Sequence, residues 1–311
     1  MNPIVHATNR DRDHVTVCAA VRSAPPASGV AAAVAAVATA LLTSPAALAS
    51  NPEGCASGRM TGGSRLLATA LTDDGRLLCF NVRNPGKARE IGQVQGLLAA
   101  DTALIGVDYR IQDGLLYGVG NGGGVYRIDT DNATATFVNS LSVPLSGAAF
   151  GVDFNPAADR LRIISDDGQN LRHNVNPGGV TIADAALNYT AGVAAAGIGG
   201  AAYTNNDADP NTGTTLFDLD TTLDQVVLQS PPNTGALAST GKLGADLDAA
   251  AGFDIYTRSV DGITAGNLGF AALTDGSGTS QLYRVDLLNG RATPVGAFAE
   301  TVVDIALPVK Q

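Results

Sequence analysis

An aspartate recurs at one position of a short motif that appears five times along the chain. Four copies carry the aspartate and one carries an alanine, in the order Asp108, Asp153, Ala202, Asp254 and Asp304. Carboxylates that separate repeats bring together can form a ring around a hard cation such as Ca²⁺, which takes about 6–8 oxygen ligands. The alternative is that each carboxylate accepts hydrogen bonds from backbone groups of its own repeat, a common role for repeated aspartates.

An acidic loop offers a second candidate site for a cation. Asp207, Asp209, Asn211 and Asp218 carry oxygens at the spacing of the ligands in a calcium-binding loop. The match is partial, because Gly213 falls one position later than in such loops and an aspartate stands where a glutamate is usual. The segment around Asp218 also reads as a strand instead of a helix. An ordinary solvated loop is the alternative.

The densest polar cluster lies between residues 159 and 173, and it is the first place where we expect a ligand. Its members are Arg160, Arg162, Asp166, Asp167, Gln169, Asn170, Arg172 and His173. In a strand, Arg160 and Arg162 would share one face, where they could bind a carboxylate or phosphate group bidentately. Alternatively, the same arginines form structural salt bridges with the neighbouring aspartates.

Signatures of familiar enzyme classes are absent from the sequence. No G-x-S-x-G or H-E-x-x-H motif occurs, and residues 121–124 lack the lysine and the following helix of a phosphate-binding loop. His173 is the only histidine after residue 49, and the chain has no tryptophan for sugar stacking. The first hypothesis is therefore a non-enzymatic binding or scaffold module. The alternative is a hydrolase or lyase that uses carboxylates for acid–base catalysis, with or without calcium.

The residue pattern predicts that the candidate residues lie on short β-strands and the turns between them. From residue 65 onward, Val, Ile, Leu and Tyr alternate in short runs broken by Gly, Asn, Asp and Pro, and no segment keeps a helical period. The motif begins at residues 106, 151, 200, 252 and 302, and repeats of roughly 40–50 residues are typical of β-propeller blades. We predict an all-β fold, a five-bladed β-propeller of four-stranded blades. A pair of β-sandwiches and an open solenoid are the competing folds.

The two ends of the repeat array complement each other. Residues 70–82 match residues 272–286 strand for strand, but the first copy has no opening strand before it. The last opening strand, residues 302–307, has no blade after it. We predict that residues 302–307 pair beside residues 66–72, so that the N- and C-terminal strands close the ring and hide its edges. An open solenoid would instead need capping repeats.

The chain divides into three segments. Residues 1–49 read as a secretory signal peptide, because three arginines precede an uncharged alanine-rich run and the small residues 47–49 suit a signal peptidase. Residues 50–64 form a polar lead-in, and residues 65–311 form the propeller domain. Since residues 23–52 carry no charge, an uncleaved membrane anchor is the alternative for the first segment. We expect a secreted, extracellular protein.

The net charge and the cysteines limit the partners and the cellular compartment that we expect for this protein. Removal of residues 1–49 leaves 16 Lys and Arg against 27 Asp and Glu, a formal net charge of −11. Such an acidic surface disfavours nucleic acid and anionic lipid as partners. We expect a monomer whose partner is an extracellular ligand or protein. Cys18 leaves with the signal peptide, and we expect Cys55 and Cys79 to form one disulfide. Two unpaired thiols are the alternative.

Several longer motifs resemble a known family. They are the run GVDFNPAADRLRIIS at residues 151–165 and the segments at residues 168–172, 202–206, 215–220 and 231–235. Together they are similar to the domain-of-unknown-function 4394 family over roughly residues 65–308, and residues 207–213 depart from it like an insertion. The resemblance implies a secreted bacterial domain like a β-propeller, without an assigned activity, and it supplies no catalytic residues.

Overall fold

The structure is a computed structural model that describes residue 55 and residues 66–207, 209, 211–245 and 251–309. The predicted signal peptide and, apart from Cys55, the predicted lead-in lie outside the described residues. Within the described ranges, no helix is both long and apolar enough to cross a membrane.

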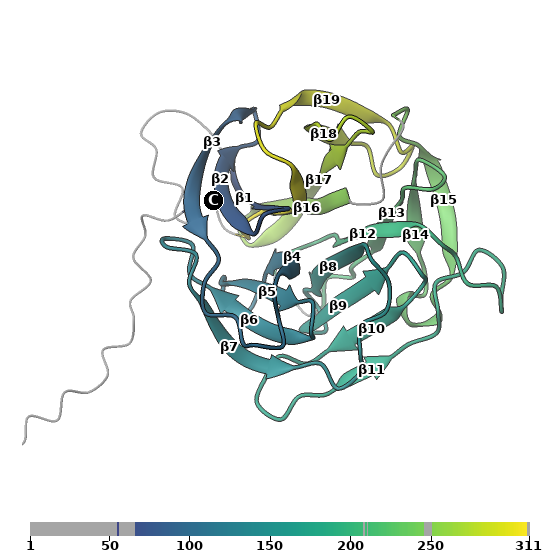
Figure 1. The fold of residues 1–311 in the computed structure, drawn as a ribbon. Coiled ribbons are helices and arrows are strands. Elements are labelled where there is room, and N and C mark those ends of the chain that lie inside the picture. The colour runs from purple at the N-terminus through teal and green to yellow at the C-terminus, as the bar shows by residue number, and fades with distance from the viewer. Residues whose placement is uncertain (1–54, 56–65, 208, 210, 246–250, 310–311) are drawn as a thin grey trace, which may run out of the picture. The chain divides into compact units, whose positions relative to one another are not determined.

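The described strands form five four-stranded antiparallel sheets, which are the blades of a β-propeller (Figure 1). Blade 1 contains β20 (Val302–Ala306), β1 (Leu67–Thr72), β2 (Arg76–Asn81) and β3 (Asn84–Gln93). Blade 2 contains β4 (Leu104–Tyr109), β5 (Leu116–Gly120), β6 (Gly124–Ile128) and β7 (Ala135–Ser140), and blade 3 contains β8 (Phe150–Asn155), β9 (Arg160–Ser165), β10 (Asn170–His173) and β11 (Thr181–Ala183). Blade 4 contains β12 (Ile198–Tyr203), β13 (Leu216–Asp220), β14 (Gln225–Gln229) and β15 (Leu237–Lys242), and blade 5 contains β16 (Ala251–Val260), β17 (Ile263–Thr274), β18 (Ser280–Val285) and β19 (Ala292–Ala297). The predicted all-β, five-bladed fold is confirmed.

The last strand of the chain completes the first blade. β20 pairs antiparallel with β1, with Thr69 opposite Ala306 and Leu71 opposite Asp304. The inner strands β20, β4, β8, β12 and β16 contact one another in ring order, and β16 contacts β20. The predicted closure of the ring by the two ends of the repeat array is therefore confirmed.

Four of the five motif copies begin with glycine, and at these positions neighbouring inner strands approach closely. A Cβ added at Gly106 of β4 would lie 2.5 Å from a methyl carbon of Val152 on β8. A Cβ added at Gly252 of β16 would lie 2.6 Å from the Cα of Asp304 on β20. A larger residue at Gly106 or Gly252 would push the blades apart, so these glycines hold Asp108 and Asp254, two positions later, close to the neighbouring inner strands.

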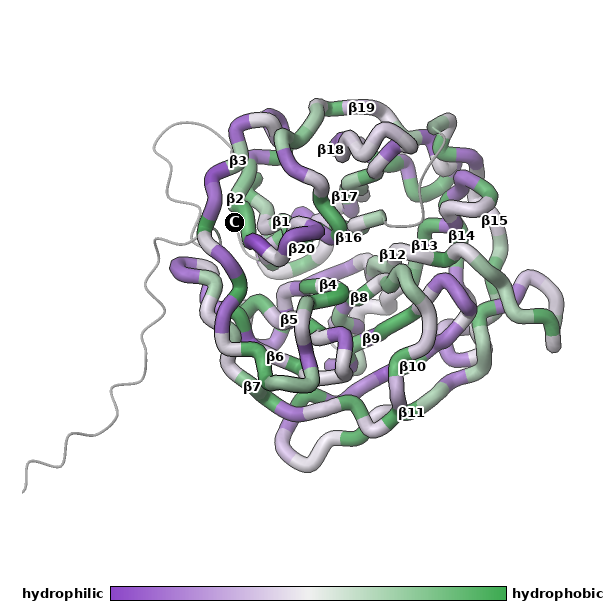
Figure 2. The backbone as a smooth tube through the Cα atoms, in the orientation of Figure 1, coloured by the Kyte–Doolittle hydropathy of each residue, from purple (hydrophilic) through white to green (hydrophobic). Residues whose placement is uncertain are grey.

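The hydrophobic core lies between neighbouring blades. Tyr117 of β5 and Phe154 of β8 join blades 2 and 3 through an edge-to-face contact with 5.3 Å between ring centres. Phe80 of β2 and Phe298, which follows β19, join blades 1 and 5 in the same way at 5.0 Å. The outer strand β3 is mostly exposed and hydrophilic (Figure 2). Each blade thus buries its faces against its neighbours, as strands of period two require.

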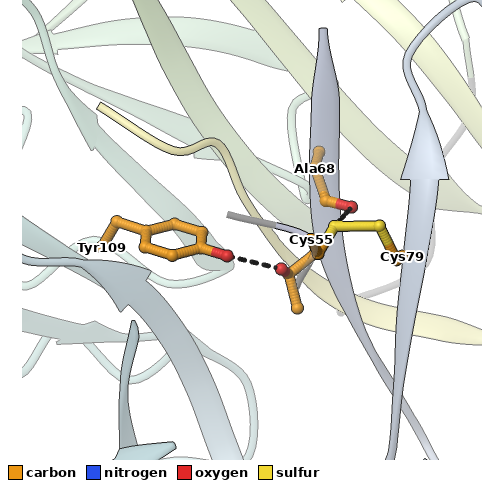
Figure 3. The surroundings of a disulfide bond; sticks show 5 residues. Cys55, Ala68, Cys79 and Tyr109 are labelled. Carbon is orange, nitrogen blue, oxygen red and sulfur yellow. Dashed lines mark hydrogen bonds between the residues drawn. A yellow bond between two sulfur atoms is a disulfide. The ribbon is translucent and has the colours of Figure 1, made fainter. Parts of the chain in front are cut away.

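The two cysteines that follow the predicted signal peptide are joined at blade 1. Cys55 and Cys79 form a disulfide, with 5.4 Å between their Cα atoms (Figure 3). Cys79 belongs to β2, and the Cys55 sulfur lies 3.0 Å from the carbonyl oxygen of Ala68 on β1. Close by, the hydroxyl groups of Thr69 and Tyr109 are 2.9 Å apart and link β1 to β4. The bond therefore attaches the segment before β1 to the closure blade.

Candidate functional site

Four aspartates lie at equivalent positions of the inner strands. We call them the axial aspartates, because inner strands surround the axis of a propeller: Asp304 on β20, Asp108 on β4, Asp153 on β8 and Asp254 on β16. All four are buried, with at most 6% of the residue surface exposed. Carboxylate oxygens of Asp108, Asp153 and Asp254 lie within 4.8 Å of one another. Among the described residues, no other three acids, histidines or cysteines come this close together.

The axial aspartates also connect consecutive blades. Each carboxylate accepts a hydrogen bond from a backbone N–H of the following blade: Asp304 from Val107 at 2.8 Å, Asp108 from Phe154 at 2.7 Å, Asp153 from Tyr203 at 3.2 Å and Asp254 from Leu307 at 2.5 Å. Blade 4 carries Ala202 at this position and makes no such bond. Asp108, Asp254 and Asp304 also accept the N–H of the next residue on their own strand, as the sequence suggested. The carboxylates are therefore part of what holds the ring together.

Burial disfavours the charged form of the axial aspartates. Desolvation is the main reason why the pKa of each of the four carboxyl groups lies well above its usual range, and it raises the pKa of Asp254 to about 7. The neighbouring carboxylates raise the pKa values of Asp108 and Asp153 further, and the backbone N–H bonds oppose the shift. When ionised, the cluster repels itself, so either protons or a cation must neutralise it.

The predicted calcium loop does not assemble. Asp207 accepts hydrogen bonds from Thr264 and from the backbone N–H of Asp209, and Asp209 in turn accepts from the N–H of Asn211. Asp218 instead lies in the middle of β13 and is fully buried. The acidic residues do not come within the distance at which they could share a cation. The position of Asp218 within β13 separates it from the other acids of the loop, and both of its carboxylate oxygens lack a hydrogen-bond partner in the described part of the chain.

The arginines of the polar cluster find partners inside the fold. Arg162 is 3% exposed and forms an ion pair with Asp184 at 2.9 Å, and Arg172 pairs with the same carboxylate at 3.0 Å. Arg162 also donates to the Tyr203 hydroxyl of β12. Arg160 donates only to carbonyl groups of its own loop. The predicted shared face of Arg160 and Arg162 therefore does not form a bidentate site, and Arg162 joins blade 3 to blade 4.

The other members of the cluster are also engaged in local hydrogen bonds. His173 is fully buried between the Thr181 hydroxyl and the Asn139 side chain, and desolvation, with the charge of Arg160, lowers its pKa to about 4. The remaining members bind loop and turn groups of blades 3 and 4: Asp166 the N–H of Ala148, Asp167 the Ser165 hydroxyl, Gln169 the carbonyl of Pro144, and Asn170 the carbonyl of Pro232. These side chains are thus occupied by hydrogen bonds within the fold.

A groove of about 840 Å³ lies between blades 4 and 5, where the sequence indicated no site. It is lined by residues of the β12–β13 loop, β13, β17, β18, the β18–β19 turn and β19: Thr204, Asn205, Thr215, Phe217, Asn267, Leu268, Arg284, Val285, Asp286, Leu287, Leu288, Arg291 and Thr293. Its volume falls in the range of small-molecule and peptide sites, about 300–1,000 Å³. The length of the strand-like run around residues 251–274 is the sequence signal that could have indicated the groove. This run forms the β16–β17 hairpin, whose strands are about twice as long as the first two strands of the other blades.

The groove combines an apolar floor with positive charge. Phe217 and Val285 are buried beneath it. In the part of the chain that the structure describes, the side chains of Arg284 and Arg291 have no hydrogen-bond or ion-pair partner. Asp286 is engaged by the N–H of Leu288 and by the Asn289 side chain. In a chain with a net charge of −10, two unpaired arginines at one groove favour a ligand that carries carboxylates.

Comparisons with known proteins identify a family but no activity. The model of the domain-of-unknown-function 4394 family (DUF4394) matches residues 76–306. No protein with a curated description matches the chain.

Several solved structures are similar to this chain at low sequence identity. An auxiliary nutrient binding protein from Bacteroides ovatus is 14% identical over 73% of this chain and 58% of its own, with a TM-score of 0.38. A protein of unknown function from Bacteroides thetaiotaomicron is 14% identical over 75% of this chain and 58% of its own, with a TM-score of 0.42. Glutaminyl cyclase from Myxococcus xanthus is 12% identical over 68% and 72%, with a TM-score of 0.35. The chain spans less than two thirds of the length of the two Bacteroides proteins.

Proposed function

The chain belongs to the domain-of-unknown-function 4394 family, and we propose that it is a secreted, monomeric binding module that takes its ligand in the groove between blades 4 and 5. The observation that carries this proposal is the groove itself, which joins an apolar floor to the two unpaired arginines, Arg284 and Arg291. Binding sites are typically concave and largely apolar, with a few polar groups that fix the orientation of the ligand.

The position of the carboxylates favours binding over catalysis. A hydrolase or lyase needs an acid and a base that both reach the substrate. The axial aspartates are buried and do not line the groove. Among the residues that line it, Asp286 is the only carboxylate, and it caps the β18–β19 turn. The groove therefore offers contacts for a ligand without a pair of groups for acid–base chemistry.

A fragment screen by NMR tests the groove as the binding site. Fragments that carry a carboxylate should shift the amide signals of residues 204–205, 267–268 and 285–291. Combined Arg284→Ala and Arg291→Ala substitutions should weaken their binding about tenfold or more, because each lost charge-assisted hydrogen bond is worth roughly 1.5–3 kcal/mol. Arg83→Ala, in an exposed turn of blade 1, is the matched control and should change nothing. Fragments that gather at the blade 3 cluster instead would refute the proposal.

We also propose that the axial aspartates hold one Ca²⁺ that stabilises the ring. Three carboxylate oxygens lie within 4.8 Å of one another, a hard cation prefers oxygen ligands, and a cation would relieve the repulsion within the cluster. Asp153 accepts only one long backbone bond through Oδ1, at 3.2 Å from Tyr203, which leaves it free to act as a ligand.

The melting temperature in calcium and in chelator tests this second proposal. Calcium at one hundred times its dissociation constant should stabilise the fold by about 2.7 kcal/mol. Combined Asp153→Asn and Asp254→Asn substitutions should remove the increase, while Asp207→Asn with Asp209→Asn should keep it. An unchanged melting curve in millimolar calcium would show that protons, not a cation, neutralise the cluster. Loss of the increase only in the loop variant would place the cation there.

A further inference from the structure

Strand β17 extends beyond its neighbour on one side. β16 pairs with β17 as far as Ile263, whereas β18 pairs with it only from Gly269 onward. Among the described strands, residues 263–268 of β17 therefore have a partner on one side only. An unpaired edge presents backbone N–H and C=O groups to which another strand can bind.

The unpaired edge borders the groove. Asn267 and Leu268 line the groove together with residues 285–288, which turn away from β17 after the last pair between the two strands. A Cβ added at Gly266 would meet no atom within 4 Å, so the space beside this residue is open. The carboxylate of Asp207 accepts hydrogen bonds from the N–H and the hydroxyl of Thr264, at 3.3 and 2.7 Å. The N–H of Thr264 is therefore already occupied within the chain, and the open part of the edge is at residues 265–268.

Exposed apolar side chains lie at the ends of the elements that flank this edge. Val260 and Ile263 face each other at the tip of the β16–β17 hairpin and are 53% and 67% exposed, and Leu288 in the β18–β19 turn is 82% exposed. Leu288 also lines the groove, as do the two unpaired arginines. Because side chains of a strand alternate between its two faces, an added strand can present apolar residues to one wall and acidic residues to the arginines.

We propose that the ligand of the groove is an extended acidic peptide segment of a partner protein, which adds a strand to residues 265–268 of β17. Main-chain hydrogen bonds to the edge supply affinity, and pairing of the peptide carboxylates with Arg284 and Arg291 supplies specificity. The inference rests on the proposed function of the groove, and it names the class of partner.

Synthetic peptides test this inference directly. The probe is a hexapeptide of alternating valine and glutamate with both ends blocked, titrated into the purified protein and followed by NMR. Two further versions carry N-methyl groups on the first, third and fifth residues or on the second, fourth and sixth. An added strand uses the amides of one edge only, so one N-methylated version should lose binding at least tenfold and the other should bind like the parent. Amide signals of residues 265–268 should move.

Charge provides the second arm of the test. A valine–lysine version should bind at least tenfold more weakly than the valine–glutamate peptide, and combined Arg284→Gln and Arg291→Gln substitutions should abolish that preference. Arg83→Gln is the control for loss of a surface charge. Equal binding of both N-methylated peptides, equal binding of the lysine version, or no binding at all would overturn the inference. If carboxylate fragments still bind in the groove in that case, the proposed function stands and only the peptide partner falls.

Discussion

At the scale of single residues, the axial aspartates combine two roles that need opposite charge states. Asp304 and Asp108 accept backbone N–H groups of the next blade at 2.8 and 2.7 Å, and hydrogen bonds to a carboxylate favour its ionised form. Burial and mutual repulsion favour the protonated form. The balance between these effects makes the ring sensitive to pH and to cations.

In chelator, the axial aspartates should make stability fall as the pH rises from about 4 to about 8. The fall should be clearest above about 6.5, because buried His173, whose pKa is lowered to about 4 from 6.5, makes stability rise with pH below that value. The pKa of Asp254 is about 7 in the folded protein against an ordinary value of 3.8, so over this window the folded state binds more protons than the unfolded state. The stabilisation is complete at a pH below the pKa of the unfolded state, and it is lost as the pH rises through the pKa of the folded state. Between the two pKa values, the free energy of unfolding falls by about 1.4 kcal/mol per pH unit for each such proton. Urea unfolding measured at intervals of pH would record it.

The Asp254→Asn variant should show a shallower pH dependence of stability than the parent. The exposed Asp131→Asn is its control and should keep the parental slope. A stability that is flat between pH 6.5 and 8, or an unchanged slope in Asp254→Asn, would contradict the assignment of the proton to this cluster.

At the scale of elements, the joint between blades 3 and 4 depends on one buried cation. Arg162 of β9 reaches Asp184, the Tyr203 hydroxyl of β12 and the Asn233 side chain in the loop between β14 and β15. These partners come from three separate segments. The polar cluster that the sequence marked as a ligand site is thus a structural joint around this arginine.

Arg162→Met should destabilise the protein by about 3–5 kcal/mol, because it leaves buried acceptors without their donor and weakens the charge balance of Asp184. Arg160→Met, two residues earlier on the same strand, removes bonds only to the carbonyl groups of its own loop and should cost less than about 1 kcal/mol. Thermal or urea unfolding of both variants would measure the difference. Equal costs for the two substitutions would refute the role of Arg162 as the joint.

At the scale of the whole molecule, the ring depends on contacts between the two ends of the domain. Val302, Ile305 and Leu307 are at most 3% exposed, and Asp304 binds the N–H of Val107 across 197 residues of sequence. Burial of each of the three apolar side chains contributes about 1.5–3 kcal/mol. Their sum is comparable with the whole stability of a typical domain, about 5–15 kcal/mol.

Deletion of residues 302–311 should therefore unfold the domain or lower its melting temperature severely, as circular dichroism and limited proteolysis would show. A synthetic peptide of residues 302–309 added in trans should restore part of the lost stability, because β20 docks through its own pairing with β1. A truncated protein that is as stable and as soluble as the parent would contradict closure by the C-terminal strand.

The strands, the number of blades and the closure of the ring could all be predicted from the sequence. Alternation of apolar residues, turn residues and the spacing of the glycine–aspartate motif are local features, and each repeats along the chain. The complementary ends, residues 66–72 and 302–307, could be matched for the same reason. The cysteine pair could be assigned because only Cys55 and Cys79 remain after the predicted signal peptide.

The contacts between side chains from distant segments could not be predicted from the sequence and are seen only in the folded protein. Arg162 finds Asn233 across 71 residues, and Asp218 is buried between blades although its spacing fits a calcium loop. The groove forms where the β16–β17 hairpin extends beyond the end of β18 and lies opposite the β12–β13 loop of blade 4. Partners of this kind depend on how separate blades pack against each other. A repeating sequence specifies each blade locally, but the surfaces between blades arise only when the ring is assembled.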